Sequence, residues 1–214
     1  MSPRYHPSHA MLVDYAAGAL QPGRALVMAT HVHACPLCRQ EVTLAESVGG
    51  ALLDELPPVA MAAGALEAAL ARLDEPPPEP PSAAAAHPRP NWIEVPNDVL
   101  EAALKRKRWA APGVWVAPIS KGPKGQSTYL LRVAAGMAVP LHSHKGVEMI
   151  CVLKGAYKDR GHIHRPGDIA ENDESVEHRP KVTREGECVC LIAADGPLVA
   201  RDWVGRLFQP FVGI

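Results

Sequence analysis

The chain has 214 residues, which suffices for one large domain or two small ones, and 47% of them are hydrophobic. The formal net charge of −1 supplies no basic field for direct binding to nucleic acid or to an anionic membrane, and no run of about 18 apolar residues predicts a membrane span. Five cysteines, an odd number, in a chain without a signal-peptide core predict a cytoplasmic protein with metal-bound or free thiols rather than a disulfide framework.

The first 75 residues predict a small helical unit. Ser8 is suited to cap a helix, and Pro22 is suited to the first turn of the next one. The Gly-Gly pair at residues 49–50 is expected to end or bend a later helix, because glycine weakens helices. Four helices are therefore predicted, over about residues 8–18, 22–34, 35–50 and 61–73.

A metal-binding pattern lies inside this unit. Residues 29–40 read ATHVHACPLCRQ, which sets His31, Cys35 and Cys38 in a His-x3-Cys-x2-Cys array. Four residues span about one helical turn, so His31 and Cys35 can share a helix face, and two cysteines three residues apart can hold one ion. Thiolates beside an imidazole favour tetrahedral zinc over calcium or magnesium. The array therefore predicts a zinc site.

A closed structural zinc site needs a fourth ligand. His33 is the nearest candidate, but it lies about 200° around a helix from His31 and is expected to point away. His6 or His9 can supply the ligand if the chain before the first helix folds back. The alternative is a Cys-x-x-Cys redox centre of a thiol oxidoreductase. Such motifs lie in a strand-to-helix turn, however, and the segment before Cys35 is predicted to be helical.

A proline-rich stretch separates the helical unit from the rest of the chain. Residues 74–90 contain seven prolines, which predicts a semi-rigid linker. Beyond it, short apolar or β-branched segments alternate with glycine or proline turns, which is typical of a β-barrel or β-sandwich. Three of the expected strands cover residues 128–134, 147–153 and 187–193. We therefore predict two domains of an α plus β chain: a helical domain over 1–75, a linker over 76–90 and a β-domain over 91–214.

The β-domain contains a second array of possible metal ligands. It reads Gly136-x5-His142-x-His144-x3-Glu148-x6-Gly155. The array resembles the first cupin motif along its whole length. Residues i and i+2 of a strand share a face, so His142 and His144 both point inward, and Glu148 follows a tight corner to face the same cavity. A looser second motif, with Pro-Gly-Asp at 166–168, precedes His178, which can complete a site for zinc, iron, manganese or nickel.

Other cysteines, histidines and basic residues stand outside these arrays. Cys188-x-Cys190 places two thiols on one strand face, about 6.6 Å apart at Cα by strand rise. This is near the upper limit for a disulfide, so the pair is either two small buried residues or an oxidant-sensitive pair near the cupin metal. Cys151 is expected in the core, the basic run at 105–108 at a solvated helix end, and His162 and His164 on the surface of a hairpin.

The parts of the chain together resemble a known family. The HVHACPLC segment, the early His6 and the surrounding helices are similar to the zinc-binding anti-sigma domain, and the order of parts resembles ChrR-type anti-sigma factors over nearly the entire chain. The resemblance implies a protein that binds and inhibits an extracytoplasmic-function sigma factor in a 1:1 complex, without catalysis. It implies that the cupin-like half mediates a response to singlet oxygen or related oxidants. It also implies two metal sites. One holds zinc, and its ligands are His6, His31, Cys35 and Cys38. The other holds a second divalent metal, expected to be zinc, and its ligands are His142, His144, Glu148 and His178.

A metal-dependent cupin enzyme is the competing hypothesis. Three histidines and a carboxylate can leave open coordination positions on iron, which a dioxygenase requires; an isomerase is the other possibility, and the helical half would then be an interaction module. A zinc-locked helical clamp gives such an enzyme no evident advantage. Two zinc ions per chain without oxygen uptake favour regulation, whereas cupin-bound iron with turnover favours catalysis.

Overall fold

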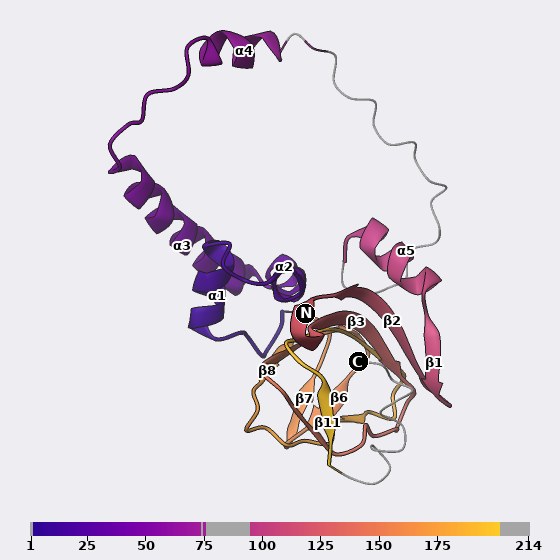
Figure 1. Cartoon of the computed structure of the whole chain (residues 1–214). Coiled ribbons are helices and arrows are strands. Elements are labelled where there is room, and N and C mark those ends of the chain that lie inside the picture. Colours follow the sequence, from indigo (N-terminus) through magenta and orange to yellow (C-terminus); the bar gives the residue numbers. More distant parts are fainter. Residues whose placement is uncertain (1, 74, 76–94, 202–214) are drawn as a thin grey trace.

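The computed structural model describes residues 2–73, 75 and 95–201 (Figure 1). The predicted linker over 76–90 lies outside the described residues, as do the first four and the last 13 residues of the predicted domain over 91–214. Among the described residues, none of the helices is long and apolar enough to cross a membrane.

Four helices form the N-terminal half: α1 (His9–Ala16), α2 (Pro22–Ala34), α3 (Pro36–Asp54) and α4 (Ala65–Ala71). The Ser8 side chain accepts a hydrogen bond from the Met11 amide, which confirms the predicted cap of α1. The predicted end at residues 49–50 is wrong, because α3 continues through both glycines; the alternative, a bend at this point, stays a prediction. A glycine inside a helix costs only about 1 kcal/mol relative to alanine, and the preceding turns carry the helix onward. The helix predicted over 61–73 is shorter, because Gly64 at φ 79° cannot join a right-handed helix.

The C-terminal half begins with α5 (Asn97–Lys105), whose basic end is solvated as predicted. Eleven described strands follow: β1 (Arg108–Ala111), β2 (Val114–Lys121), β3 (Ser127–Val133), β4 (His142–His144), β5 (Glu148–Lys154), β6 (Tyr157–Asp159), β7 (His162–His164), β8 (Ile169–Asn172), β9 (Lys181–Val182), β10 (Cys188–Ala194) and β11 (Leu198–Ala200). The three strands predicted by residue range correspond to β3, β5 and β10, each displaced by one residue.

The strands form a cupin-like β-sandwich. One antiparallel sheet has the order β1-β2-β3-β10-β5-β8, and the smaller sheets have the orders β7-β6-β9 and β11-β4. The predicted barrel or sandwich is thus confirmed. One detail is wrong: His162 is exposed on its hairpin as expected, but His164 is buried, because Tyr157 and Tyr5 lie against its ring with centroids 4.8 and 4.6 Å away. Tyr5 belongs to the distant N-terminal segment, which the local strand pattern cannot reveal.

The central strands of the large sheet are buried on both faces. In β10, Cys190 and Ile192 face the interior of the sandwich, whereas Leu191 and Ala193 face outward and pack in one cluster with Met28 of α2. A strand that is covered on both faces has a continuous apolar sequence rather than an alternating one. The sequence of β10, CVCLIAA, is of this continuous kind. The N-terminal helices therefore complete the outer core of the C-terminal sheet.

The helix α2 approaches this sheet closely. A Cβ atom added to Gly23 would lie 2.1 Å from the Thr128 hydroxyl oxygen, so a side chain there would force a local rearrangement. Nearby, Arg24 pairs with Asp195 at 3.0 Å, and both side chains are largely buried. Gly23 and this ion pair set α2 against β3 and β10 (Figure 1).

Candidate metal centres

Four potential ligands from separate parts of the N-terminal half converge on one point. His6 precedes α1, His31 lies in the last turn of α2, Cys35 joins α2 to α3, and Cys38 lies in the first turn of α3. One ligand atom from each of them lies within 4.8 Å of the others. His9, the alternative to His6, is instead exposed and sits 3.9 Å from Glu41.

The distances in this cluster suit a tetrahedral zinc ion. His31 Nε2 lies 3.2 Å from Cys38 Sγ, and His6 Nδ1 lies 3.4 Å from the sulfur atoms of both Cys35 and Cys38. Ideal Zn–S and Zn–N bonds at tetrahedral angles separate a sulfur from a nitrogen by about 3.5 Å. Two thiols and two imidazoles also form a donor set that zinc prefers. The cluster therefore fits zinc in both chemistry and geometry.

The tautomer of His31 is fixed by a residue outside its own helix. Its Nδ1 donates a hydrogen bond to the backbone oxygen of Gly167, at 2.6 Å. Because a carbonyl only accepts, the lone pair of His31 is left on Nε2, which faces Cys38. Burial lowers the pKa of His31 and keeps the ring neutral, whereas burial and the neighbouring Cys35 raise the pKa of Cys38 to about 12. A bound metal must therefore displace the Cys38 proton.

A second group of four potential ligands lies inside the cupin-like sandwich. His142 and His144 are on β4, Glu148 begins β5, and His178 lies between β8 and β9. Their ligand atoms are within 4.8 Å of one another, and all four residues are buried. His178 pairs with His142 through two backbone hydrogen bonds, of 3.0 and 3.1 Å, which place it beside β4 as a neighbouring strand would.

The imidazoles of this cluster turn their lone pairs toward a common centre. His178 Nδ1 donates to the Asp159 carboxylate at 2.8 Å, and His142 Nδ1 donates to the backbone oxygen of Pro140 at 2.8 Å. A ring that donates through Nδ1 carries its lone pair on Nε2 whenever it is neutral, and the two Nε2 atoms are 3.0 Å apart. Facing lone pairs repel each other, and a cation between them removes that repulsion. The arrangement fits a divalent metal.

Burial sets the charges of the other two ligands. It lowers the pKa of His144 to about 3, helped by the neighbouring histidines, so this ring is neutral at neutral pH. It also raises the pKa of Glu148 to about 7, although His178 and a 3.4 Å hydrogen bond from Asn172 favour the charged form. The His144 ring can therefore bind metal at neutral pH without losing a proton, whereas a metal bound by Glu148 displaces the proton from the protonated fraction of this carboxyl group.

Sequence reasoning missed the residues that orient these ligands. Asp159 holds His178 from a strand of the smaller sheet, and the Gly167 carbonyl holds His31 from the other half of the chain. Partners of this kind fix the tautomer and direction of metal-binding histidines. Neither carries a sequence signal, because Asp159 belongs to no motif and a backbone carbonyl is present in every residue.

An apolar cavity of about 280 Å³ extends from the second cluster into the sandwich. The residues that line it include His142, Glu148 and His178 of the cluster, and also Cys188 and Cys190. The two sulfur atoms are 3.7 Å apart and buried, which is compatible with both interpretations of the pair, and Cys151 is buried as predicted.

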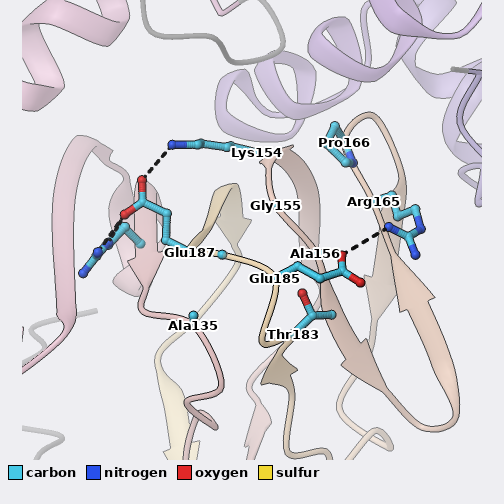
Figure 2. Close-up of a pocket in the computed structure, with 11 residues that line it drawn as sticks. Ala135, Lys154, Gly155, Ala156, Arg165, Pro166, Thr183, Glu185 and Glu187 are labelled. Atoms are coloured by element: carbon cyan, nitrogen blue, oxygen red, sulfur yellow. Dashed lines mark hydrogen bonds and ion pairs between the residues drawn. The ribbon is translucent and has the colours of Figure 1, made fainter.

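A larger, open groove lies elsewhere on the C-terminal half, as Figure 2 shows. Its cationic side chains are already paired: Glu187 contacts Arg132 at 2.7 Å and Lys154 at 2.9 Å, and Glu185 lies 3.9 Å from Arg165. Each of the three cationic side chains therefore already has a carboxylate partner within 4 Å.

Comparison with known proteins agrees with this architecture. Residues 100–198 match the family model of the ChrR cupin-like domain. The chain is also 37% identical, over the full length of both proteins, to the anti-sigma-E factor ChrR of Cereibacter sphaeroides. The chain belongs to the ChrR family of anti-sigma factors. A crystal structure of Rhodobacter sphaeroides SigE in complex with the anti-sigma ChrR is similar as well, with 35% identity, a TM-score of 0.76, and coverage of 90% of this chain and 99% of the other. The named ChrR relatives are regulators rather than enzymes.

Proposed function

We propose that this chain acts on a protein partner, because the long helix α3 presents an unusual apolar surface. Leu37, Leu44, Val48 and Leu52 are spaced by seven, four and four residues, so they lie on one side of the helix, and each is more than half exposed. A further apolar row lies on and just after α4, formed by Leu66, Leu70 and Leu73. Figure 1 shows α3 and α4 extending away from the sheets. Contiguous exposed apolar surface of this kind marks a protein interaction site.

We propose that this chain is an anti-sigma factor that binds and inhibits an extracytoplasmic-function sigma factor through the apolar surface of α3 and α4. The membership in the ChrR family and the crystallised complex of a relative with SigE support this partner. Zinc held by His6, His31, Cys35 and Cys38 fixes the angle between α2 and α3, which gives the clamp its shape. Because a sigma factor acts on RNA polymerase, the protein works in the cytoplasm.

The apolar surface can be tested with matched charges on α3. Leu44→Glu/Leu52→Glu is expected to weaken binding to the proposed sigma-factor partner by about 100-fold or more, because apolar residues at the centre of an interface carry most of its binding energy. The measurement is titration of the purified sigma factor by calorimetry. Thr43→Glu/Gly50→Glu is the control, since it places the same charges on the opposite, exposed side of the helix. Equal loss in both variants, or loss in neither, contradicts the proposed surface.

We further propose that the cupin-like domain, with a second zinc at His142, His144, Glu148 and His178, receives an oxidative signal. The apolar cavity gives singlet oxygen or a related oxidant access to both the ligand cluster and the Cys188–Cys190 pair. Oxidation of a ligand or thiol changes local charge and packing, which weakens the complex.

An illuminated photosensitiser provides the test of this response. Added to the purified complex, it is expected to release the sigma factor, whereas Cys188→Ser/Cys190→Ser and His144→Ala complexes are expected to release it several-fold more slowly. Release is followed by size-exclusion chromatography, with complexes kept in the dark as the control. Unchanged release rates in both variants would show that the signal enters elsewhere.

A further inference from the structure

The segment before α1 lies along a strand of the cupin-like domain. The Ile169 amide at the start of β8 donates to the Tyr5 carbonyl at 3.2 Å, and the Ser8 amide donates to the Glu171 carboxylate at 2.8 Å. We call residues 4–8 the N-terminal arm. The arm contains His6, so this ligand of the first cluster is held in place by the opposite half of the chain.

Asp168 is the main anchor of the N-terminal arm. One of its carboxylate oxygens accepts hydrogen bonds from the backbone amides of Arg4, at 2.6 Å, and Tyr5, at 3.1 Å. The other oxygen accepts from the Arg165 amide at 2.8 Å. The residue is only 2% exposed. Hydrogen bonds to a charged, buried acceptor are among the stronger ones in proteins, so Asp168 fixes the two residues just before His6.

The residue next to Asp168 acts on a different ligand of the same cluster. The Gly167 carbonyl accepts the 2.6 Å hydrogen bond from His31 Nδ1 described above. Gly167 adopts φ 90°, in the region that favours glycine, so a non-glycine residue would strain this turn. Figure 2 shows the preceding residues, Arg165 and Pro166, on the side of the groove that faces the helices. Two adjacent residues of one turn therefore act on two ligands of the first cluster. Gly167 contacts His31 directly, and Asp168 contacts Tyr5, the residue before His6.

We propose that the Gly167–Asp168 turn of the cupin-like domain is a positioning element of the N-terminal zinc site. Asp168 holds His6 in reach of the cysteines, and the Gly167 carbonyl sets the tautomer and direction of His31. The inference rests on the proposed zinc site and adds that the site is assembled from both halves of the chain. The strand β8, which follows this turn, also reaches the second cluster, because Asn172 at its far end donates a hydrogen bond to Glu148.

Cobalt distinguishes the two sites in the full-length chain. Only the first cluster contains thiolates, so thiolate-to-cobalt charge-transfer absorption reports on that cluster alone. Asp168→Asn is expected to speed the loss of this absorption after addition of EDTA by about 10- to 100-fold, the usual effect of removing a partner that orients a ligand. Hydrogen exchange of the Arg4 and Tyr5 amides in the metal-free chain is expected to rise in the same variant.

Two further variants make the result decisive. Asp195→Asn removes the Arg24 ion pair between the two halves without touching the N-terminal arm, and it is expected to release cobalt at the unaltered rate. Glu171→Ala, at a half-buried position, removes only the Ser8 contact and is expected to accelerate release about threefold to tenfold, even if Asp168→Asn does not fold. The inference is overturned if cobalt is released at the same rate from the unaltered chain, from Glu171→Ala and from any folded Asp168→Asn. It is also overturned if Asp195→Asn accelerates the release of cobalt as much as these variants do. Absence of the thiolate absorption from the unaltered chain would instead refute the zinc site itself.

Discussion

Replacing Cys35 and Cys38 together by serine is expected to abolish capture of the sigma factor by the full-length chain. The helices α1 to α3 bury few large apolar side chains, namely Leu12, Val27, Met28 and Val42. Structural zinc stabilises small zinc-finger peptides by on the order of 10 kcal/mol, which is comparable to the whole stability of a small domain. Serine cannot supply a thiolate, so α3 loses its fixed angle to α2.

Metal content and capture are measured on the same samples. The double variant is expected to contain one zinc ion per chain instead of two, and to retain no sigma factor in a pull-down. Cys188→Ser/Cys190→Ser is the matched control, because it makes the same chemical change at two buried positions outside the N-terminal cluster, and it is expected to keep both properties. Undiminished capture by the Cys35→Ser/Cys38→Ser chain would refute the role of the metal.

The pH dependence of the metal-free protein is expected to change when Glu148 is replaced by glutamine. The folded-state pKa of Glu148 is raised from 4.5 to about 7 by burial, so the unaltered chain is destabilised as pH rises through this interval. Below pH 4.5 the carboxyl group is protonated in both the folded and unfolded states, and no difference arises. Above pH 7 the change amounts to about 3 kcal/mol, at about 1.4 kcal/mol for each pH unit. Glutamine does not titrate and escapes this loss.

Denaturant unfolding at pH 4 and pH 8, after removal of metal, provides the measurement. Relative to the unaltered chain, Glu148→Gln is expected to gain up to about 3 kcal/mol between these two pH values. Zinc is expected to reverse the order at pH 8, because an amide is a poorer ligand than a carboxylate. Glu185→Gln, at an exposed position, is the control. A difference that does not vary with pH would show that Glu148 is not forced to ionise in a buried site.

The grouping of most cluster residues was predictable, because their spacing alone restricts where they can point; their role as metal ligands stays a prediction. His31 and Cys35 are one helical turn apart, and His142 and His144 alternate along a strand, so local geometry determines a common face. His6 and His178 needed the family resemblance, since chain reversals far away in sequence bring them to their clusters. The residues that hold the ligands, Asp159 and the Gly167 carbonyl, were not predictable, because contacts between distant segments leave no periodic pattern.

The contact between the two halves could also not be predicted from the sequence pattern. Apolar residues on both faces of β5 and β10 indicate that something covers the sheet, but several elements could do so equally well. The sequence does not indicate the close approach at Gly23, because a glycine near the start of a helix is common. The extension of α3 past residues 49–50 shows the converse: a residue known to weaken helices is tolerated when its neighbours favour continuation.

The sheet that is covered by α2 limits how such proteins can be rebuilt. Its outer surface is apolar, with Met149, Cys151 and Leu191 buried in one cluster with residues of the helices. A cupin-like half produced alone would expose this surface to water and aggregate, unless a substitute helix or several polar replacements covered it. Exchanging the sensory half for another one, in engineering or in evolution, therefore requires redesign of a whole packing layer and not merely a new junction in the proline-rich stretch.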